Sequence, residues 1–462
     1  MSQSRNVAGE GAHADTETDA AAASGGFTAY GWYVVLIGMA ISIVAVLDRQ
    51  VLSLLVEPIK ADLAITDVQF SLLAGLAFSL FYALGGIPLG PIIDKRSRVA
   101  ILSGGLLVWS AATFCSGFAR SFPALFAARV LVGVGEATLQ PTTKSLITDI
   151  FYGRHLAKAI SMVAVGSAIG GGLAFLAGAT VLHYVGGREV IELPLVGAVR
   201  PWQFVFMVVG IPGLILAPLA YFTIREPQRR RVLVDGQGTT APATYLQLWK
   251  FCREHARAAG CVMIGYAIYS MAFQGMLAWT PAHLIRARAM EASDVGFTLG
   301  IVQLAVNVGM MLVSAWWVDR RNARGTTDGA LQWSRATACL GLLPMLLFPY
   351  VSDDHLSLGL VILALVGTSG QLIGAVPLMQ LMPSQLRGKA MVTYMLLSNL
   401  IAGVIGPTLI ATFNQGVFGD PARIGQSLSI VGSGALVTAI AVFTFGMRHF
   451  RASIAQLDRQ TV

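Results

Sequence analysis

Four charged side chains lie deep inside hydrophobic segments in the first half of this chain. Asp48 and Arg49 interrupt one long apolar run, and Arg129 and Glu136 interrupt another. A charge at the middle of a bilayer costs at least about 2.5–3.5 kcal/mol, so such residues usually mark a functional site. Two acids and two bases in two segments indicate ion-paired partners, and the carboxylates could also relay protons.

The two segments can present these charges to each other. Arg129, Gly133 and Glu136 follow the spacing i, i+4, i+7, which places them on one helix face with about 10 Å between the first and the last. Asp48 and Arg49 lie about two turns below the outer end of the first segment, at a depth close to that of Arg129. We therefore predict that the two helices pair charges across one cavity, with Glu136 opposite Arg49.

The chemistry of these four residues favours proton coupling. Burial disfavours the charged form of a carboxylate and a nearby guanidinium favours it, so a change of surroundings alters proton affinity. We predict that Asp48 is the principal proton-coupling residue, assisted by Glu136, and that Arg49 and Arg129 are charge partners or hold a substrate head group. The alternative is a static buried ion pair that only fixes helix packing, although such pairs seldom add net stability.

The composition is that of a membrane protein. Hydrophobic residues make up 55% of the 462 residues and charged residues only 12%, against about 25% charged residues in soluble domains. A helix needs about 20 apolar residues to cross the hydrocarbon core. Twelve such runs are present, at roughly 31–56, 67–91, 99–118, 122–147, 157–184, 202–224, 258–284, 295–318, 334–351, 356–381, 388–414 and 427–447.

The longest polar stretch, at about 225–255, divides the runs into six plus six. We therefore predict an all-α membrane protein with twelve transmembrane helices in two six-helix bundles. The predicted parts are a disordered N-terminal tail at 1–27, an N-terminal bundle at 28–225, a cytoplasmic linker at 226–255, a C-terminal bundle at 256–450 and a C-terminal tail at 451–462.

Positive charge predicts the orientation. The net charge is +8, and most Lys and Arg residues lie in short clusters in the loops of one side. Such an excess marks cytoplasmic loops, so we predict a multi-pass protein of the cell inner membrane with both termini cytoplasmic. Clusters placed between apolar runs differ from a nucleic-acid groove, and no nucleic-acid partner is expected.

Nothing in the sequence indicates an enzyme. The motifs GxxxxGK[ST], HExxH and GxSxG do not occur, and the four cysteines form no CxxC pair. We therefore expect no catalytic residues, no cofactor and no metal site. Without a nucleotide site, transport must be driven by an ion gradient or by exchange.

Two matching charge clusters follow the second helix of each half. GPIIDKRSR holds Asp94, Lys95 and Arg98, and SAWWVDRR holds Asp319 and Arg320. Parallel repeats with a site between them are a common transporter plan. We predict that these residues gate the protein by latching its halves together on the inner side through charge-assisted bonds. Solvated anchors of topology are the alternative.

The second half carries no charge at mid-membrane depth. Polar side chains set among Met, Phe and Leu are predicted to line its wall of the cavity: Tyr266, Tyr269, Gln274, Gln303, Asn307, Tyr394 and Asn399. A cavity with charges on one wall and few polar groups on the other suits an amphipathic substrate.

Several motifs resemble those of a known family. GPIIDKRSR resembles the signature loop between helices 2 and 3 of the major facilitator superfamily, although Ser97 stands where the family usually has Gly, which predicts a less tight turn. GSAIGGG (166–172) resembles its glycine-rich fifth-helix motif. LDRQ (47–50), RVLVGVGEA (129–137) and WTP (279–281) resemble the Spinster-like subfamily.

This resemblance implies a function in transport, since the subfamily is associated with sphingolipids and lysolipids in animals and its bacterial members resemble proton-coupled carriers. We expect a secondary transporter that moves a lipid-like or amphipathic organic substrate with protons by alternating access, as a monomer among membrane lipids. One alternative is an organic-anion or sugar-phosphate antiporter with Arg49 and Arg129 as the anion clamp. The other is a non-transporting receptor or a passive lipid scramblase.

Overall fold

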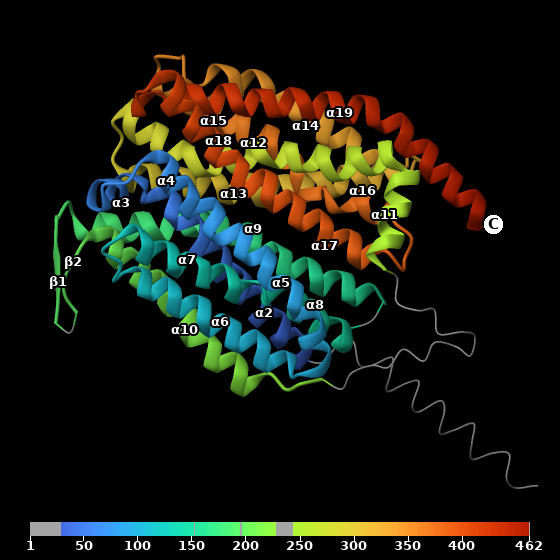
Figure 1. Cartoon of the computed structure of the whole chain (residues 1–462), viewed down its shortest axis with the longest axis horizontal. Coiled ribbons are helices and arrows are strands. Elements are labelled where there is room, and N and C mark those ends of the chain that lie inside the picture. The colour runs from blue at the N-terminus through green and yellow to red at the C-terminus, as the bar shows by residue number, and fades with distance from the viewer. Residues whose placement is uncertain (1–28, 152, 195, 228–243, 462) are drawn as a thin grey trace, which may run out of the picture.

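Two helical bundles lie side by side, and each is built from one half of the chain (Figure 1). This computed structural model describes residues 29–151, 153–194, 196–227 and 244–461. The predicted fold class is confirmed. The predicted N-terminal tail and residues 228–243 of the predicted linker lie outside the described residues.

The first half of the chain forms the N bundle. Its elements are α2 (Ala29–Leu54), α3 (Val56–Leu63), α4 (Asp67–Ser71), the π-helical η1 (Leu72–Leu76), α5 (Ala77–Lys95), α6 (Arg98–Ser116), α7 (Phe122–Glu136), α8 (Leu139–Ile150), α9 (Gly153–Val185), β1 (Ile191–Leu193), β2 (Gly197–Val199) and α10 (Pro201–Thr223). The two strands pair antiparallel, with Ile191 opposite Val199.

The second half forms the C bundle. Its elements are α11 (Tyr245–Glu254), α12 (Ala256–Arg288), α13 (Ala292–Asn322), α14 (Gly329–Leu347), α15 (Asp354–Thr368), η2 (Ser369–Ile373), α16 (Ala375–Leu381), α17 (Arg387–Ser398), the π-helical η3 (Asn399–Ile405), α18 (Gly406–Phe413), η4 (Asn414–Phe418), η5 (Pro421–Arg423) and α19 (Ile424–Thr461). The predicted linker thus contains a helix, α11, and α19 continues through the predicted C-terminal tail as far as Thr461.

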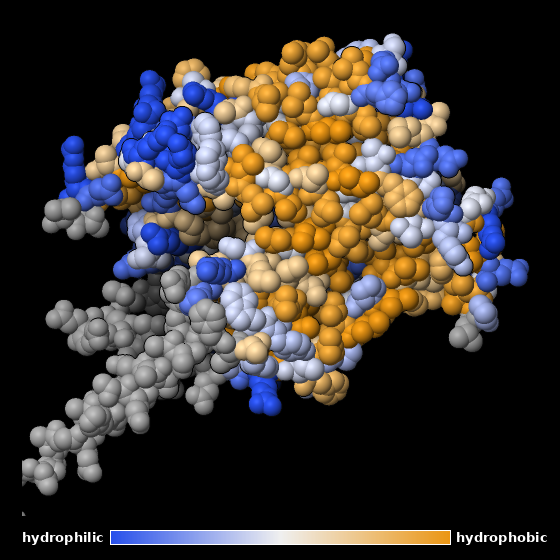
Figure 2. All heavy atoms as spheres, turned by 180° about the vertical axis from the view of Figure 1, so that it is seen from behind, coloured by the Kyte–Doolittle hydropathy of each residue, from blue (hydrophilic) through white to orange (hydrophobic). Residues whose placement is uncertain are grey.

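Apolar side chains cover the outside of the bundles. Figure 2 shows a broad hydrophobic surface between polar ends, as a bilayer requires of a spanning protein. Among the described residues, eleven segments are long and apolar enough to cross a membrane. The remaining predicted span corresponds to α14, a less apolar helix of 19 residues that packs against α15 and α19.

The molecule has two distinct ends. The hairpin end carries β1, β2, α3 and α4, and the α11 end carries α11 and the last turns of α19 (Figure 1). Helix α2 runs toward the hairpin end, whereas α7 begins there and runs back. The two helices that hold the four central charges are therefore antiparallel, as predicted.

A proline interrupts the path of the fourth hydrophobic segment beside its acidic residue. Helix α7 ends at Glu136, and α8 begins at Leu139 with Pro141 as its third residue. Proline cannot donate a backbone hydrogen bond, and its ring collides with the carbonyl four residues earlier, here that of Ala137. Pro141 therefore explains the break that follows Glu136.

Glycines allow the backbones of the two bundles to approach each other closely toward the hairpin end. A Cβ atom added to Gly75 in η1 would lie 2.5 Å from the carbonyl oxygen of Gly403 in η3. One added to Gly172 in α9 would lie 2.7 Å from the carbonyl oxygen of Gly300 in α13. Both contacts join the N bundle to the C bundle, and only glycine permits such an approach of backbones.

Candidate functional site

Arg49 and Glu136 form an ion pair between α2 and α7. Nη2 of Arg49 donates to Oε1 of Glu136 over 2.7 Å. The Glu136 side chain is 3% exposed, whereas the Arg49 side chain is 35% exposed because it borders a cavity. The Arg49 guanidinium also lies 4.8 Å from the centre of the Phe78 ring. The predicted contact between these two helices is therefore present.

Asp48 and Arg129 lie next to this pair along α2 and α7 but are sealed from water. Their exposed fractions are 0% and 1%. Both terminal nitrogens of Arg129 donate to the backbone carbonyl oxygen of Asp48, each over 3.2 Å. The Asp48 carboxylate accepts no hydrogen bond of normal geometry within the described chain, although the Thr113 hydroxyl lies close to it.

Helix geometry explains why Arg49 and Glu136 lie at the cavity, whereas Asp48 and Arg129 lie inside the N bundle. Successive residues of an α-helix point about 100° apart. Arg49 turns toward the cavity, so Asp48 must turn into the N bundle, where Arg129 meets its backbone. The prediction that all four charges face one cavity is therefore wrong for Asp48 and Arg129 in this conformation.

The cavity beside Arg49 lies in the half of the molecule toward the α11 end. It has three adjoining lobes, of about 240, 210 and 270 Å³, and Gln140 of α8 lines all of them. Arg49 and Glu136 line the third lobe, together with Asn399 of the C bundle. The surface between the two bundles is hollowed at this end (Figure 2).

The walls of the second lobe differ in chemistry. The N bundle contributes Tyr82, Gln140 and Lys144 to it, along with small residues and a proline. The C bundle contributes an almost wholly apolar wall, made of Met391, Val392, Met395 and Leu396 with the single amide of Asn399. The lobe therefore has a polar side and a hydrocarbon side, as the sequence predicts for the cavity.

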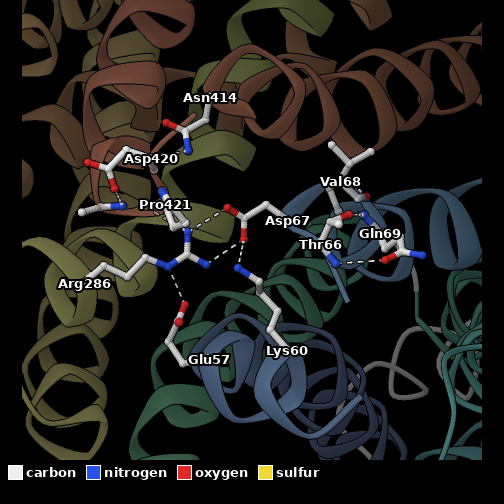
Figure 3. Close-up of polar contacts among 12 residues, drawn as sticks. Glu57, Lys60, Thr66, Asp67, Val68, Gln69, Arg286, Asn414, Asp420 and Pro421 are labelled. Atoms are coloured by element: carbon white, nitrogen blue, oxygen red, sulfur yellow. Dashed lines mark hydrogen bonds and ion pairs between the residues drawn. The ribbon is translucent and has the colours of Figure 1, made fainter. Parts of the chain in front are cut away.

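Ion pairs close the interface at the hairpin end. Arg286 of α12 donates through Nε to Glu57 over 2.6 Å, and through Nη1 and Nη2 to Asp67 over 2.9 and 2.7 Å. Lys60 approaches the same Asp67 carboxylate at 2.5 Å. Figure 3 shows the guanidinium directed toward acids of α3 and α4. Because the Arg286 side chain is only 7% exposed, these bonds hold the bundles together with little water between them.

Sequence reasoning missed this cluster. The acidic partners of Arg286 lie more than two hundred residues before it in the chain. The sequence nevertheless contained a signal for this cluster. A base of the second half and two acids of the first half all lie at the same predicted face of the membrane.

Arg98 fastens parts of the N bundle to one another. Its guanidinium donates to Asp149 at the end of α8 and, over 2.7 Å, to Glu226 after α10. Burial acts to raise the pKa of the Glu226 carboxyl, but hydrogen bonds from Arg98, from the Val99 backbone and from Ser97 outweigh it and hold that pKa below its ordinary value. Arg98 is therefore an anchor within one bundle, and in this conformation it does not join the halves.

The other predicted gate residues make no latch in this conformation. The Asp94 side chain lies outside the described part of the chain, while Lys95 is exposed at the end of α5. Asp319 and Arg320 are exposed on α13, where the Arg320 guanidinium lies 5.6 Å from the Trp316 ring of its own helix. In this conformation the cavity lies toward the α11 end, and the ion pairs of Arg286 close the hairpin end.

Only one of the predicted C-bundle residues lines a described lobe of the cavity, and that residue is Asn399. The Tyr266 hydroxyl bonds Ser334 and the Tyr269 hydroxyl bonds Thr337, each over 2.8 Å, so both tyrosines pack within the C bundle. They are corrected from cavity residues to internal links between α12 and α14.

The remaining candidates lie elsewhere on the C-bundle helices. Asn307 donates to Gln303 over 2.9 Å, and both side chains are buried where α13 meets α9. Tyr394 is buried on α17, and Gln274 is half-buried on α12. Among the described residues, no group of three or more His, Cys, Asp and Glu side chains could hold a metal ion.

Known proteins of similar sequence and structure identify the family. The sequence model of the Major Facilitator Superfamily matches residues 23–407. An MFS-type efflux pump of Mycolicibacterium smegmatis is 25% identical over 415 residues, which cover 88% of this chain and 91% of that protein. Human Protein spinster homolog 1 is 26% identical over 254 residues, which cover 54% of this chain and 45% of the human protein.

A solved structure shares the fold. It is described as a bacterial homolog to the human lysosomal transporter Spinster in an inward-facing and unoccupied conformation. It superimposes with a TM-score of 0.76 at 22% identity, over 92% of this chain and 99% of that one. The expected resemblance to Spinster-like proteins is supported, and the family is one of transporters and not of enzymes. The chain is a multi-pass membrane protein that belongs to the Major Facilitator Superfamily.

Proposed function

We propose that this protein is a proton-coupled secondary transporter that carries a lipid-like or amphipathic organic molecule across the cell inner membrane by alternating access. The single observation that carries the proposal is the Arg49–Glu136 ion pair on the cavity wall, one residue away from the sealed Asp48. Family membership supports transport in general. The residues of the site support the coupling and the substrate class.

Coupling requires that protonation change what the substrate meets. A proton on Glu136 cancels the negative half of the ion pair and leaves the Arg49 guanidinium free at the cavity wall. Asp48 serves as the second proton site, because a carboxylate that is fully buried gains most from neutralisation. Its burial means that α2 and α7 must shift before water reaches it.

The two ends of the interface support alternating access. Arg286 and the glycine contacts close the hairpin end while the cavity lies toward the α11 end. With both termini cytoplasmic, as the distribution of Lys and Arg favours, this conformation faces the cytoplasm. In the opposite conformation we propose that Asp94, Lys95, Asp319 and Arg320 latch the α11 end.

The apolar wall favours an amphipathic substrate over a sugar phosphate. An alkyl chain can lie against Met391, Met395 and Leu396, whereas a sugar would leave its hydroxyls without partners on that side. Arg129 is sealed and already donates two hydrogen bonds to Asp48. It therefore cannot act as the predicted anion clamp in this conformation, and we assign it a role in holding α7 against α2.

Uptake into proteoliposomes under an imposed pH gradient tests the proposal. Asp48→Asn should abolish gradient-driven accumulation of a fluorescent lysophospholipid, because the proton site is gone, while exchange across the membrane persists. Glu254→Gln, an exposed change on α11, is the matched control and should transport like the wild type.

Unchanged pH-driven uptake by Asp48→Asn would refute its role. Flux that ignores the pH gradient in the wild type would favour a passive scramblase. Strict exchange of organic anions without any proton gradient would favour the antiporter.

A further inference from the structure

Lys144 is a charged residue of the cavity wall that takes no part in the proposed proton coupling or gating. It lies on α8 within the apolar segment Phe122–Ile150 and lines two lobes of the cavity. Among the described residues its ammonium group forms no ion pair with a carboxylate. The nearby acids are already engaged, since Glu136 pairs with Arg49 and Asp149 pairs with Arg98.

A folding role does not account for this lysine. A lone ammonium in a membrane-spanning segment is costly unless water or an anion reaches it. Lys144 forms no hydrogen bond within the described chain that would stabilise the bundle, and it faces the lumen of the cavity. A residue that lowers stability at a ligand-sized cavity is explained best by the ligand.

The charges along the lining are unbalanced. Among the described lining residues, the ionised groups are Arg49, Glu136 and Lys144. The first two neutralise each other over 2.7 Å. One positive charge therefore remains, and it belongs to Lys144.

The neighbours of Lys144 determine which kind of ligand would fit beside it. Gln140 precedes it by four residues, so the two side chains lie on one helix face and can bind one head group together. Opposite them lies the apolar wall of Met391, Val392 and Leu396. A charged head and a hydrocarbon chain would thus each meet matching surface within one lobe.

We propose that Lys144 binds the anionic head group of a single-chain amphiphile, with Gln140 donating a further hydrogen bond and the alkyl chain lying against the C-bundle wall. The proposal rests on the proposed function in identifying the bound molecule with the transported one. It specifies the substrate class as an organic monoanion with an alkyl tail, and it moves the anion site from the arginines to α8.

Binding to the full-length protein in nanodiscs tests this with two probes of equal chain length, octane-1-sulfonate and octyl glucoside. The measured quantity is the ratio of the two affinities, which cancels general effects on folding and on partition into lipid. Lys144→Gln should reduce the preference for the sulfonate by about ten- to hundredfold, the range of one hydrogen bond to a charged group. Lys144→Arg should keep the preference within about threefold, since it retains the charge.

Lys158→Gln on α9, an exposed lysine outside the described lobes, is the matched control and should leave the ratio unchanged. An unchanged ratio in Lys144→Gln would overturn the proposal, as would an equal fall of the ratio in Lys158→Gln. A separate arm measures pH-driven uptake of octane-1-sulfonate by the wild type. If the ratio depends on Lys144 but no uptake occurs, the binding site stands and the proposed transport function fails.

Discussion

Glu136 has one hydrogen-bonding partner within the described chain, Arg49. Its Oε1 accepts from Arg49, and its Oε2 has no hydrogen bond within the described chain. Removing the charge should therefore release Arg49 directly. Because Arg49 is partly exposed to the cavity, we expect Glu136→Gln to cost about 1–2 kcal/mol, less than the 3–5 kcal/mol of a fully buried broken pair.

A double-mutant cycle measures this contact. Arg49→Gln added to Glu136→Gln should restore most of the lost stability, since no unpaired charge remains. Thermal unfolding followed by tryptophan fluorescence gives the coupling energy. In transport assays Glu136→Gln should lower kcat more than it raises KM, because the pair acts in the conformational step. Additive losses in the cycle would show that the two side chains are not energetically linked.

Sequence reasoning identified the contact between Arg49 and Glu136 because opposite charges at matching depths on antiparallel helices leave few alternatives. It failed for Asp48, because depth and charge do not reveal which side of a helix faces water. It also failed for Tyr266 and Tyr269, whose hydroxyl partners lie on a neighbouring helix that is 64 to 68 residues away in sequence.

At the scale of elements, the start of α6 explains why Ser97 replaces the glycine usual at this position. Its φ of −63° needs no glycine, and its hydroxyl accepts from the Ala100 N–H over 3.2 Å as the N-cap of the helix. The same hydroxyl donates to Glu226 over 2.7 Å, and the Val99 N–H donates to that carboxylate over 3.0 Å. A carboxylate at a helix N-terminus is also favoured by the helix dipole.

This anchor predicts a pH dependence of stability. The folded pKa of Glu226 is lower than its ordinary value of 4.5, so its contribution is complete above pH 4.5 and is lost as the pH falls through the lower folded pKa. Glu226→Gln should therefore lower the unfolding temperature at pH 7, and the difference from wild type should shrink toward zero in acid. Glu254→Gln is the control, and an equal difference at both pH values would contradict the assignment.

The paired π-helical segments η1 and η3 predict a conformational effect at glycine. A methyl group at Gly75 would lie 2.5 Å from the carbonyl oxygen of Gly403, so Gly75→Ala should push the bundles apart at the hairpin end. Gly104→Ala is the matched control, because a methyl group there meets nothing within 4 Å. Spin-label distances across the hairpin end should lengthen in the first variant only, and equal distances would contradict the role of this contact.

The apolar runs predicted most elements because length and hydropathy determine whether a helix can span a bilayer. They did not predict the break between α7 and α8, although Pro141 in the sequence was a signal for it. The π-helical segments η1 and η3 were not predicted, since a turn closed by i→i+5 hydrogen bonds leaves no mark in the length or hydropathy of an apolar run.

At the scale of the whole molecule, Arg286 concentrates the charge contacts between the bundles at the hairpin end. Replacing it by Gln removes two acidic partners at once and leaves Asp67 with Lys60 alone. A conformational equilibrium shifts when one state loses bonds that the other does not contain. Arg286→Gln should therefore increase the population that is open at the hairpin end.

Reaction of an introduced thiol reports this shift. Ser71 is buried and bonds Thr408 across the interface over 3.2 Å, so Ser71→Cys in a background without native cysteines should react faster when Arg286 is replaced. Arg423→Gln is the control, since that arginine pairs with Asp420 within the C bundle. Equal labelling rates in the two variants would show that Arg286 does not govern closure.

The weak hydropathy of α14 bears on how the chain enters the membrane during synthesis. Ser334 and Thr337 on this helix are buried, and their hydroxyls meet those of Tyr266 and Tyr269 on α12, which leaves the ribosome earlier. The Thr337 hydroxyl also bonds the Trp333 carbonyl of its own helix over 3.0 Å, so the tyrosines assist the position of α14 in the bundle without being its only partners. We therefore expect insertion of α14 to be assisted by α12, and chains that carry Phe at both tyrosine positions should leave α14 more accessible to glycosylation or protease during translation.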